Sequence, residues 1–78
     1  MSHTPHELHD EFPELADKIH ELKSSDAHFA RLADEYHQIN RAVHRAETNV
    51  EPVEELAETE MRKKRAHLKD ELYRMLVA

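Results

Sequence analysis

The stretch from Phe29 to Val50 constrains the fold of this 78-residue chain more than any other. Its apolar residues recur at alternating steps of three and four positions, which is an a/d heptad pattern. Such a pattern places one apolar seam along one side of an α-helix. The members of this seam are Phe29, Leu32, Tyr36, Ile39, Val43, Ala46 and Val50. We therefore expect a helix over residues 27–47 and look to the rest of the chain for its partner.

A second apolar repeat follows Pro52 and predicts a helix over residues 53–76. Asn49 tolerates the left-handed conformation that often ends a helix, and Pro52 suits the first turn of the next one. A connection this short makes the two helices antiparallel neighbours. A turn centred near residue 50 pairs positions whose numbers sum to about 100, so that Tyr36 faces Lys64 and every other level is apolar. The predicted hairpin core is Phe29, Leu32, Tyr36, Ile39, Val43, Ala57, Met61, Leu68, Leu72 and Met75.

A shorter amphipathic helix is predicted over residues 13–23, because Pro13 fits a first helical turn and a further apolar stripe starts beside it. The stripe consists of Phe12, Leu15, Ile19 and Leu22. Ser24, Ser25 and Asp26 prefer caps to helix interiors, so we expect a break there, with Ser25 or Asp26 capping the next helix. The alternative is one continuous, bent helix.

The predicted fold class is all-α: a long antiparallel, coiled-coil-like hairpin preceded by a short N-terminal helix. Residues 1–11 show no periodicity, and we expect a disordered arm followed by one domain over 12–78. A two-helix hairpin is short of core. The stripe of Phe12, Leu15, Ile19 and Leu22 is therefore expected either to fold back onto the open end of the hairpin or to cover a second chain, and it is a candidate interaction surface.

Composition narrows the function. The chain has no cysteine and no glycine, which excludes disulfides, thiolate metal sites and glycine-rich phosphate loops. No pair of carboxylates or activated serine indicates catalysis, so we expect neither an enzyme nor a cofactor. The net charge of −6 makes nucleic acid an improbable partner. No apolar run is long enough for a membrane helix or a signal peptide, and we expect a cytoplasmic protein.

Two groups of residues leave alternatives open. One basic cluster lies on the last helix and comprises Arg62, Lys63, Arg65, Lys69 and Arg74, a low-ranking candidate for an anionic partner. The chain also has eight histidines. His3, His6 and His9 recur every third residue, and His37 and His44 share a helix face, so metal binding or a pH response is a second alternative.

The residues that start and end the chain's helical part resemble those of the YdcH-like family of small bacterial proteins. The resemblance covers residues 12–76 and rests on Phe12-Pro13-Glu14-Leu15, Ile19-His20-Glu21-Leu22-Lys23, Asp26-Ala27-His28-Phe29 and the run His67 to Leu76, which contains Leu-Lys-Asp-Glu. A proline often precedes the family's counterpart of Phe29, and this chain has none there. The resemblance implies a helical hairpin and carries over no catalytic residues.

We therefore expect a non-enzymatic interaction module that self-associates, with a dimer favoured, and that binds another helical protein. The alternatives are an accessory protein that contacts nucleic acid through the basic cluster and a histidine-based metal- or pH-responsive protein.

Overall fold

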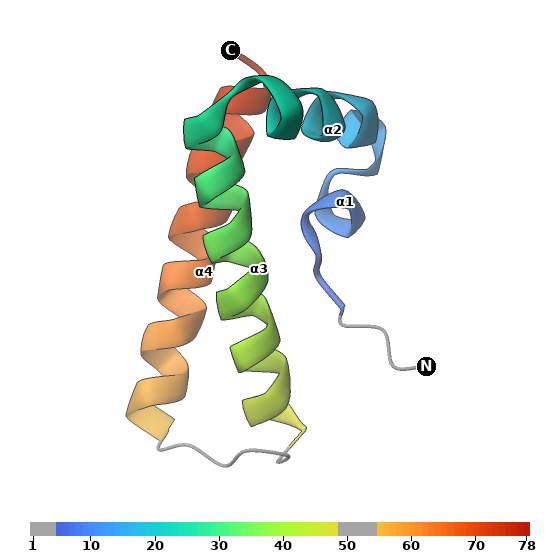
Figure 1. Cartoon of the computed structure of the whole chain (residues 1–78). Coiled ribbons are helices and arrows are strands. Elements are labelled where there is room, and N and C mark those ends of the chain that lie inside the picture. Colours follow the sequence, from blue (N-terminus) through green and yellow to red (C-terminus); the bar gives the residue numbers. More distant parts are fainter. Residues whose placement is uncertain (1–4, 49–54) are drawn as a thin grey trace.

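The computed structural model describes residues 5–48 and 55–78, and within these ranges it contains helices and no strand. The predicted all-α fold class is therefore confirmed. The elements, shown in Figure 1, are α1 (Leu8–Glu11), a 3₁₀ turn (Pro13–Leu15), α2 (Ala16–Ser25), α3 (Ala27–Glu47) and α4 (Glu55–Leu76). Of the predicted turn at residues 48–52, residues 49–52 lie outside the described residues, as do the expected first two residues of the last helix, 53 and 54.

The helices α3 and α4 form the predicted antiparallel hairpin (Figure 1). Five residues of the α3 seam are buried, namely Phe29, Leu32, Tyr36, Val43 and Ala46, with Phe29 and Val43 fully enclosed. Leu68, Leu72 and Leu76 are buried on α4. Burial of large apolar side chains on both helices is the main force that holds two such helices together.

Asp26 separates α2 from α3, as one of the two predicted arrangements required. Its backbone is extended, at φ −129° and ψ 106°. Its Oδ1 accepts hydrogen bonds from the backbone N–H groups of His28 at 3.0 Å and Phe29 at 3.1 Å. These are donors that the first turn of a helix leaves without a partner, so Asp26 acts as the N-cap of α3. The alternative of one continuous bent helix is wrong.

The helix α2 crosses the end of the hairpin where α3 begins and α4 ends (Figure 1). Ile19 is buried, and Phe12, Leu15 and Leu22 are partly buried against the core formed by α3 and α4. The Phe12 ring also stacks on Tyr73, with the ring centroids 5.2 Å apart. Of the two arrangements expected for this stripe, the structure shows the fold-back within one chain, so the stripe is not a free surface.

Three details differ from the sequence-based expectations. Residues 5–11, expected to be a disordered arm, include a helical turn whose Leu8 is buried against the core, because polar side chains of α3 and α4 hold this segment. Ala57 is exposed instead of belonging to the core, since α1 and α2 cover only the other end of the hairpin. Ile39, Met61 and Met75 are only partly buried.

At the level where Tyr36 was expected to face Lys64, Tyr36 is buried and Lys64 is exposed. The Tyr36 hydroxyl donates a hydrogen bond to the His6 carbonyl oxygen, whereas Lys64 borders a hollow beside Ile39 and Ala42. None of the helices in residues 5–48 and 55–78 combines the length and apolar character that a membrane-spanning helix requires.

Candidate functional site

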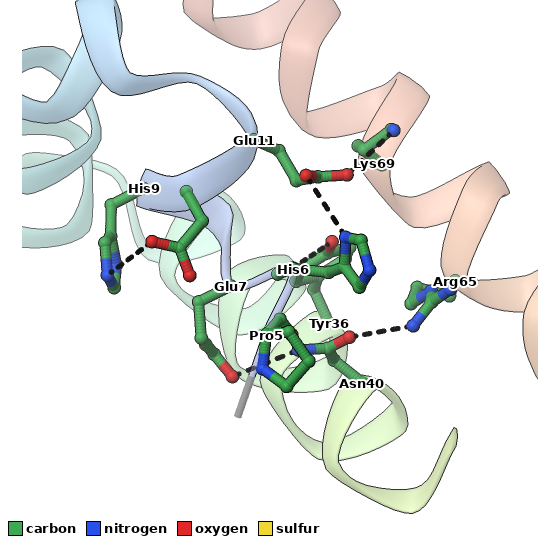
Figure 2. Close-up of polar contacts among 10 residues, drawn as sticks. Pro5, His6, Glu7, His9, Glu11, Tyr36, Asn40, Arg65 and Lys69 are labelled. Atoms are coloured by element: carbon green, nitrogen blue, oxygen red, sulfur yellow. Dashed lines mark hydrogen bonds and ion pairs between the residues drawn. The ribbon is translucent and has the colours of Figure 1, made fainter. Parts of the chain in front are cut away.

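Residues 5–11, here called the N-terminal segment, lie against α3 and α4 through a network of polar contacts (Figure 2). Tyr36 and Asn40 stand one helical turn apart on α3 and point toward the segment. The Tyr36 hydroxyl donates to the His6 carbonyl oxygen at 2.6 Å. His6 has a positive φ of 64°, a conformation that costs a non-glycine residue about 1 kcal/mol or more. The bond from Tyr36 therefore fixes a turn that the segment does not favour by itself.

Asn40 is fully buried, with an exposed fraction of 0%, and its amide joins three parts of the chain. The Nδ2 group donates to the Pro5 carbonyl oxygen at 2.8 Å and to Glu7 Oε1 at 3.2 Å. The Oδ1 atom accepts from Arg65 Nη1 on α4 at 3.0 Å. Burying a side-chain amide is tolerated when its donor and acceptor groups are hydrogen-bonded, whereas a buried amide without partners lowers the stability of the fold. Asn40 thus makes the position of the segment depend on both hairpin helices.

Acidic side chains of the segment meet basic ones of the hairpin. Glu7 Oε2 lies 2.9 Å from His37 Nδ1, and Lys69 Nζ donates to Glu11 Oε1 at 3.2 Å. His6 Nδ1 lies 3.4 Å from the other Glu11 oxygen. Because these contacts are partly exposed, each adds little to the stability of the fold. Their main effect is to match the acidic segment to basic side chains of the hairpin.

The network shifts two pKa values. Burial of the Glu11 carboxyl would raise its pKa, but the hydrogen bonds from Lys69 and His6 and their charges outweigh burial and lower the pKa below its ordinary value. Burial raises the pKa of Tyr36 to about 12, with repulsion from Glu11 adding to this effect and Arg65 opposing it. Tyr36 is therefore a neutral hydrogen-bond donor at physiological pH.

A cleft of about 400 Å³ adjoins the segment, between α1, α2 and α3. Its apolar lining includes Leu8, Ile19 and Ala33, and its polar lining includes Lys23 and Asp34. Within the described residues no three His, Cys, Asp or Glu side chains are grouped closely enough to hold a metal ion.

A second, shallower hollow of about 200 Å³ is lined by Glu35, Gln38, Ile39, Ala42 and Lys64, and we call it the open groove. Ile39 and Ala42 are partly buried, whereas the Lys64 side of the groove is exposed. Leu56 stands eight residues before Lys64 on α4, about 12 Å away along the helix axis, and does not line the groove. With an exposed fraction of 70%, it is a large apolar side chain left in water.

The predicted basic cluster does not form one surface. Arg62 pairs with Glu47 and Glu58, and Lys63 lies 3.7 Å from Glu60. Arg65 and Lys69 face the N-terminal segment instead. Arg74 is exposed in the last turn of α4.

The histidines are also dispersed. His9 lies 3.5 Å from Asp10, and His67 lies 3.1 Å from Glu71 on the next turn of α4. His6 and His37 belong to the segment network. His3, the first member of the expected N-terminal histidine repeat, lies outside the described residues.

The segment network itself was not predicted. The one local signal was a polar amide at position 40, directly beside the seam residue Ile39. An asparagine placed among core positions is a known device for fixing a specific arrangement of helices.

The chain matches the family described as "Protein of unknown function (DUF465)" over residues 29–76, more than half of its length. The matched part begins near the start of α3 and ends with α4. No curated protein and no solved structure matches the chain. The resemblance seen in the sequence is confirmed, and the chain belongs to DUF465, the YdcH-like family of small proteins of unknown function.

Proposed function

We propose that this protein is a non-enzymatic helical interaction module that self-associates through the open groove. The observation that carries the proposal is that α1 and α2 cover apolar side chains at one end of the hairpin, whereas the groove around Ile39 and Ala42 remains uncovered, as does Leu56 further along α4. Exposed apolar side chains gathered on one face commonly mark a site of protein association.

A second hairpin supplies a suitable occupant. Two hairpins that pack side by side form a four-helix bundle, in which helices bury seams that one hairpin leaves open. In a two-fold symmetric dimer, the same surface of both copies forms the interface, so each contact occurs twice. Glu35 of one copy would then pair with Lys64 of the other, because both residues line the groove. Opposite charges at these places favour one register of association.

The polar side chains give less support to other functions. The hydroxyls of Ser24 and Ser25, the last two residues of α2, donate to backbone carbonyl oxygens of their own helix. Arg62, Lys63 and Lys69 each lie within ion-pair distance of a carboxylate, which lowers the attraction that a nucleic acid would experience.

Sedimentation equilibrium tests the proposal with a matched pair of variants. Ala42→Glu places a charge in the open groove, and Val77→Glu places the same charge on an apolar residue, 55% exposed, just after the last residue of α4. We expect the wild-type chain and Val77→Glu to show a concentration-dependent dimer and Ala42→Glu to remain a monomer. A wild-type monomer at high micromolar concentration, or equal dimerisation of both variants, would show that the groove is not the interface.

A further inference from the structure

We propose that a second surface of this protein binds a short acidic segment of another protein, and that residues 5–11 are its resident occupant. The surface, here called the segment-binding surface, consists of Tyr36, His37, Asn40, Arg65 and Lys69. The proposal is independent of self-association through the open groove, because none of these residues lines that groove.

The surface binds the main chain of its occupant as well as its side chains. Tyr36 and Asn40 donate to the carbonyl oxygens of two consecutive residues, Pro5 and His6. Hydrogen bonds to main-chain atoms recognise the path of a peptide without regard to its sequence. Tyr36 and Asn40 are buried beneath the segment, with exposed fractions of 1% and 0%, so both donors are directed at the occupant of this surface.

Basic side chains of the surface favour a peptide with acidic residues at two positions. His37 contacts Glu7, and Lys69 contacts Glu11, which stands four residues later on the same side of the α1 turn. Between them, Leu8 enters the apolar core next to the cleft. The occupant that fits is therefore a segment with a glutamate, an adjoining leucine and a second acid one helical turn further on.

The contacts of the resident segment are of an exchangeable kind. Leu8 is the one residue among 5–11 whose side chain is buried in the core. The other contacts are hydrogen bonds and ion pairs, for which water substitutes when the segment leaves. Release therefore uncovers donors and cations that water solvates, together with the apolar surface of Leu8 and of the Tyr36 ring. A segment held in this way is suited to competition with a partner of the same chemistry.

The experiment compares the full chain with its N-terminal segment cross-linked to α3 and the same chain with the segment free to leave. Because the chain has no cysteine, His9→Cys with Asp34→Cys places the only two thiols on the segment and on α3, at exposed positions that line the cleft and lie outside the segment-binding surface. A short bismaleimide bridges them across a wider gap than a disulfide spans. The matched control is the same protein with both thiols capped by N-ethylmaleimide. The probe is a fluorescent peptide of residues 5–12, and its binding is followed by fluorescence anisotropy.

We expect the capped chain to bind the peptide about tenfold or more tightly than the bridged chain. In the capped chain the segment competes as a tethered occupant but can leave the surface, whereas the bridge holds it in place. Replacing both glutamates of the peptide by glutamine, or Lys69 of the capped chain by methionine, should weaken binding. Lys63→Met is the control, since Lys63 pairs with Glu60 on its own helix. Added salt should weaken binding as well.

Three outcomes would overturn the proposal. Equal binding to bridged and capped chains would place the peptide elsewhere, and absence of binding to the capped chain would show that the surface serves only to fold this chain. A bridge that forms between chains, detected by mass spectrometry, would identify the occupant as a second copy of this protein. The dimerisation assay of Ala42→Glu is read separately from each of these.

Discussion

Asn40 is the residue on which the arrangement of the N-terminal segment depends most, because one buried amide contacts Pro5, Glu7 and Arg65. Asn40→Ala would leave the Arg65 guanidinium and the Pro5 carbonyl without this partner. We expect a loss of about 1–3 kcal/mol in the free energy of unfolding, measured by urea denaturation. Gln38→Ala is the matched control, because Gln38 is exposed and bonds only within its own helix to Asp34 among the contacts described.

Tyr36 gives a pH-dependent prediction. The pKa of its hydroxyl rises to about 12 in the folded chain, above the ordinary value of 10.0. The unfolded chain therefore releases this proton first, and the stability contributed by neutral Tyr36 is present below pH 10 and lost as the pH rises toward 12. Tyr36→Phe should be less stable at neutral pH by about 1 kcal/mol, since it lacks the bond to His6.

The prediction is tested by comparing the wild-type chain with Tyr36→Phe. Denaturation midpoints measured at a series of alkaline pH values should converge, because the wild-type chain loses a contribution that Tyr36→Phe never had. A constant difference across that range would contradict the assigned role of the Tyr36 hydroxyl.

Among the elements, α2 supplies the cover for the end of the hairpin. Deleting residues 1–23 would remove Ile19 and its stripe and expose Phe29 and Leu72, which are now enclosed. We expect the remaining hairpin to stay helical by circular dichroism but to melt at a lower temperature at matched protein concentration. Deleting only residues 1–11 should have a smaller effect, because it removes Leu8 and the polar network but keeps α2. Melting temperatures unchanged by the longer deletion would show that α2 adds nothing to the hairpin.

The elements were predictable to the extent that their signals are local. The heptad pattern from Phe29 onward and the cap at Asp26 are each carried by neighbouring residues, and both helix α3 and its start follow from them. The register of α4 was harder, because Ala57 continues an apolar repeat in the sequence yet lies where no third element covers it. Periodicity shows which face of a helix is apolar, but not how far along the helix its cover extends.

At the scale of the molecule, the N-terminal segment was the part that the sequence did not reveal. Its contacts join residues 30 positions apart, as for His6 and Tyr36, or 58 apart, as for Glu11 and Lys69. Residues 1–11 have no apolar repeat, so local pattern gives no reason to expect order there. Only folding brings Tyr36, His37 and Asn40 of α3 together with Arg65 and Lys69 of α4 to form the segment-binding surface.

The joint at Asp26 has a consequence for how this protein tolerates change in chain length. A single extended residue connects α2 to α3 and also caps α3. One inserted residue in α2 would rotate everything before it by about 100° around the helix axis. The apolar stripe of α2 would then turn away from the hairpin, and residues 5–11 would be carried off with it. Insertions and deletions between Leu15 and Asp26 should therefore be far more harmful than substitutions at the exposed positions of the same stretch.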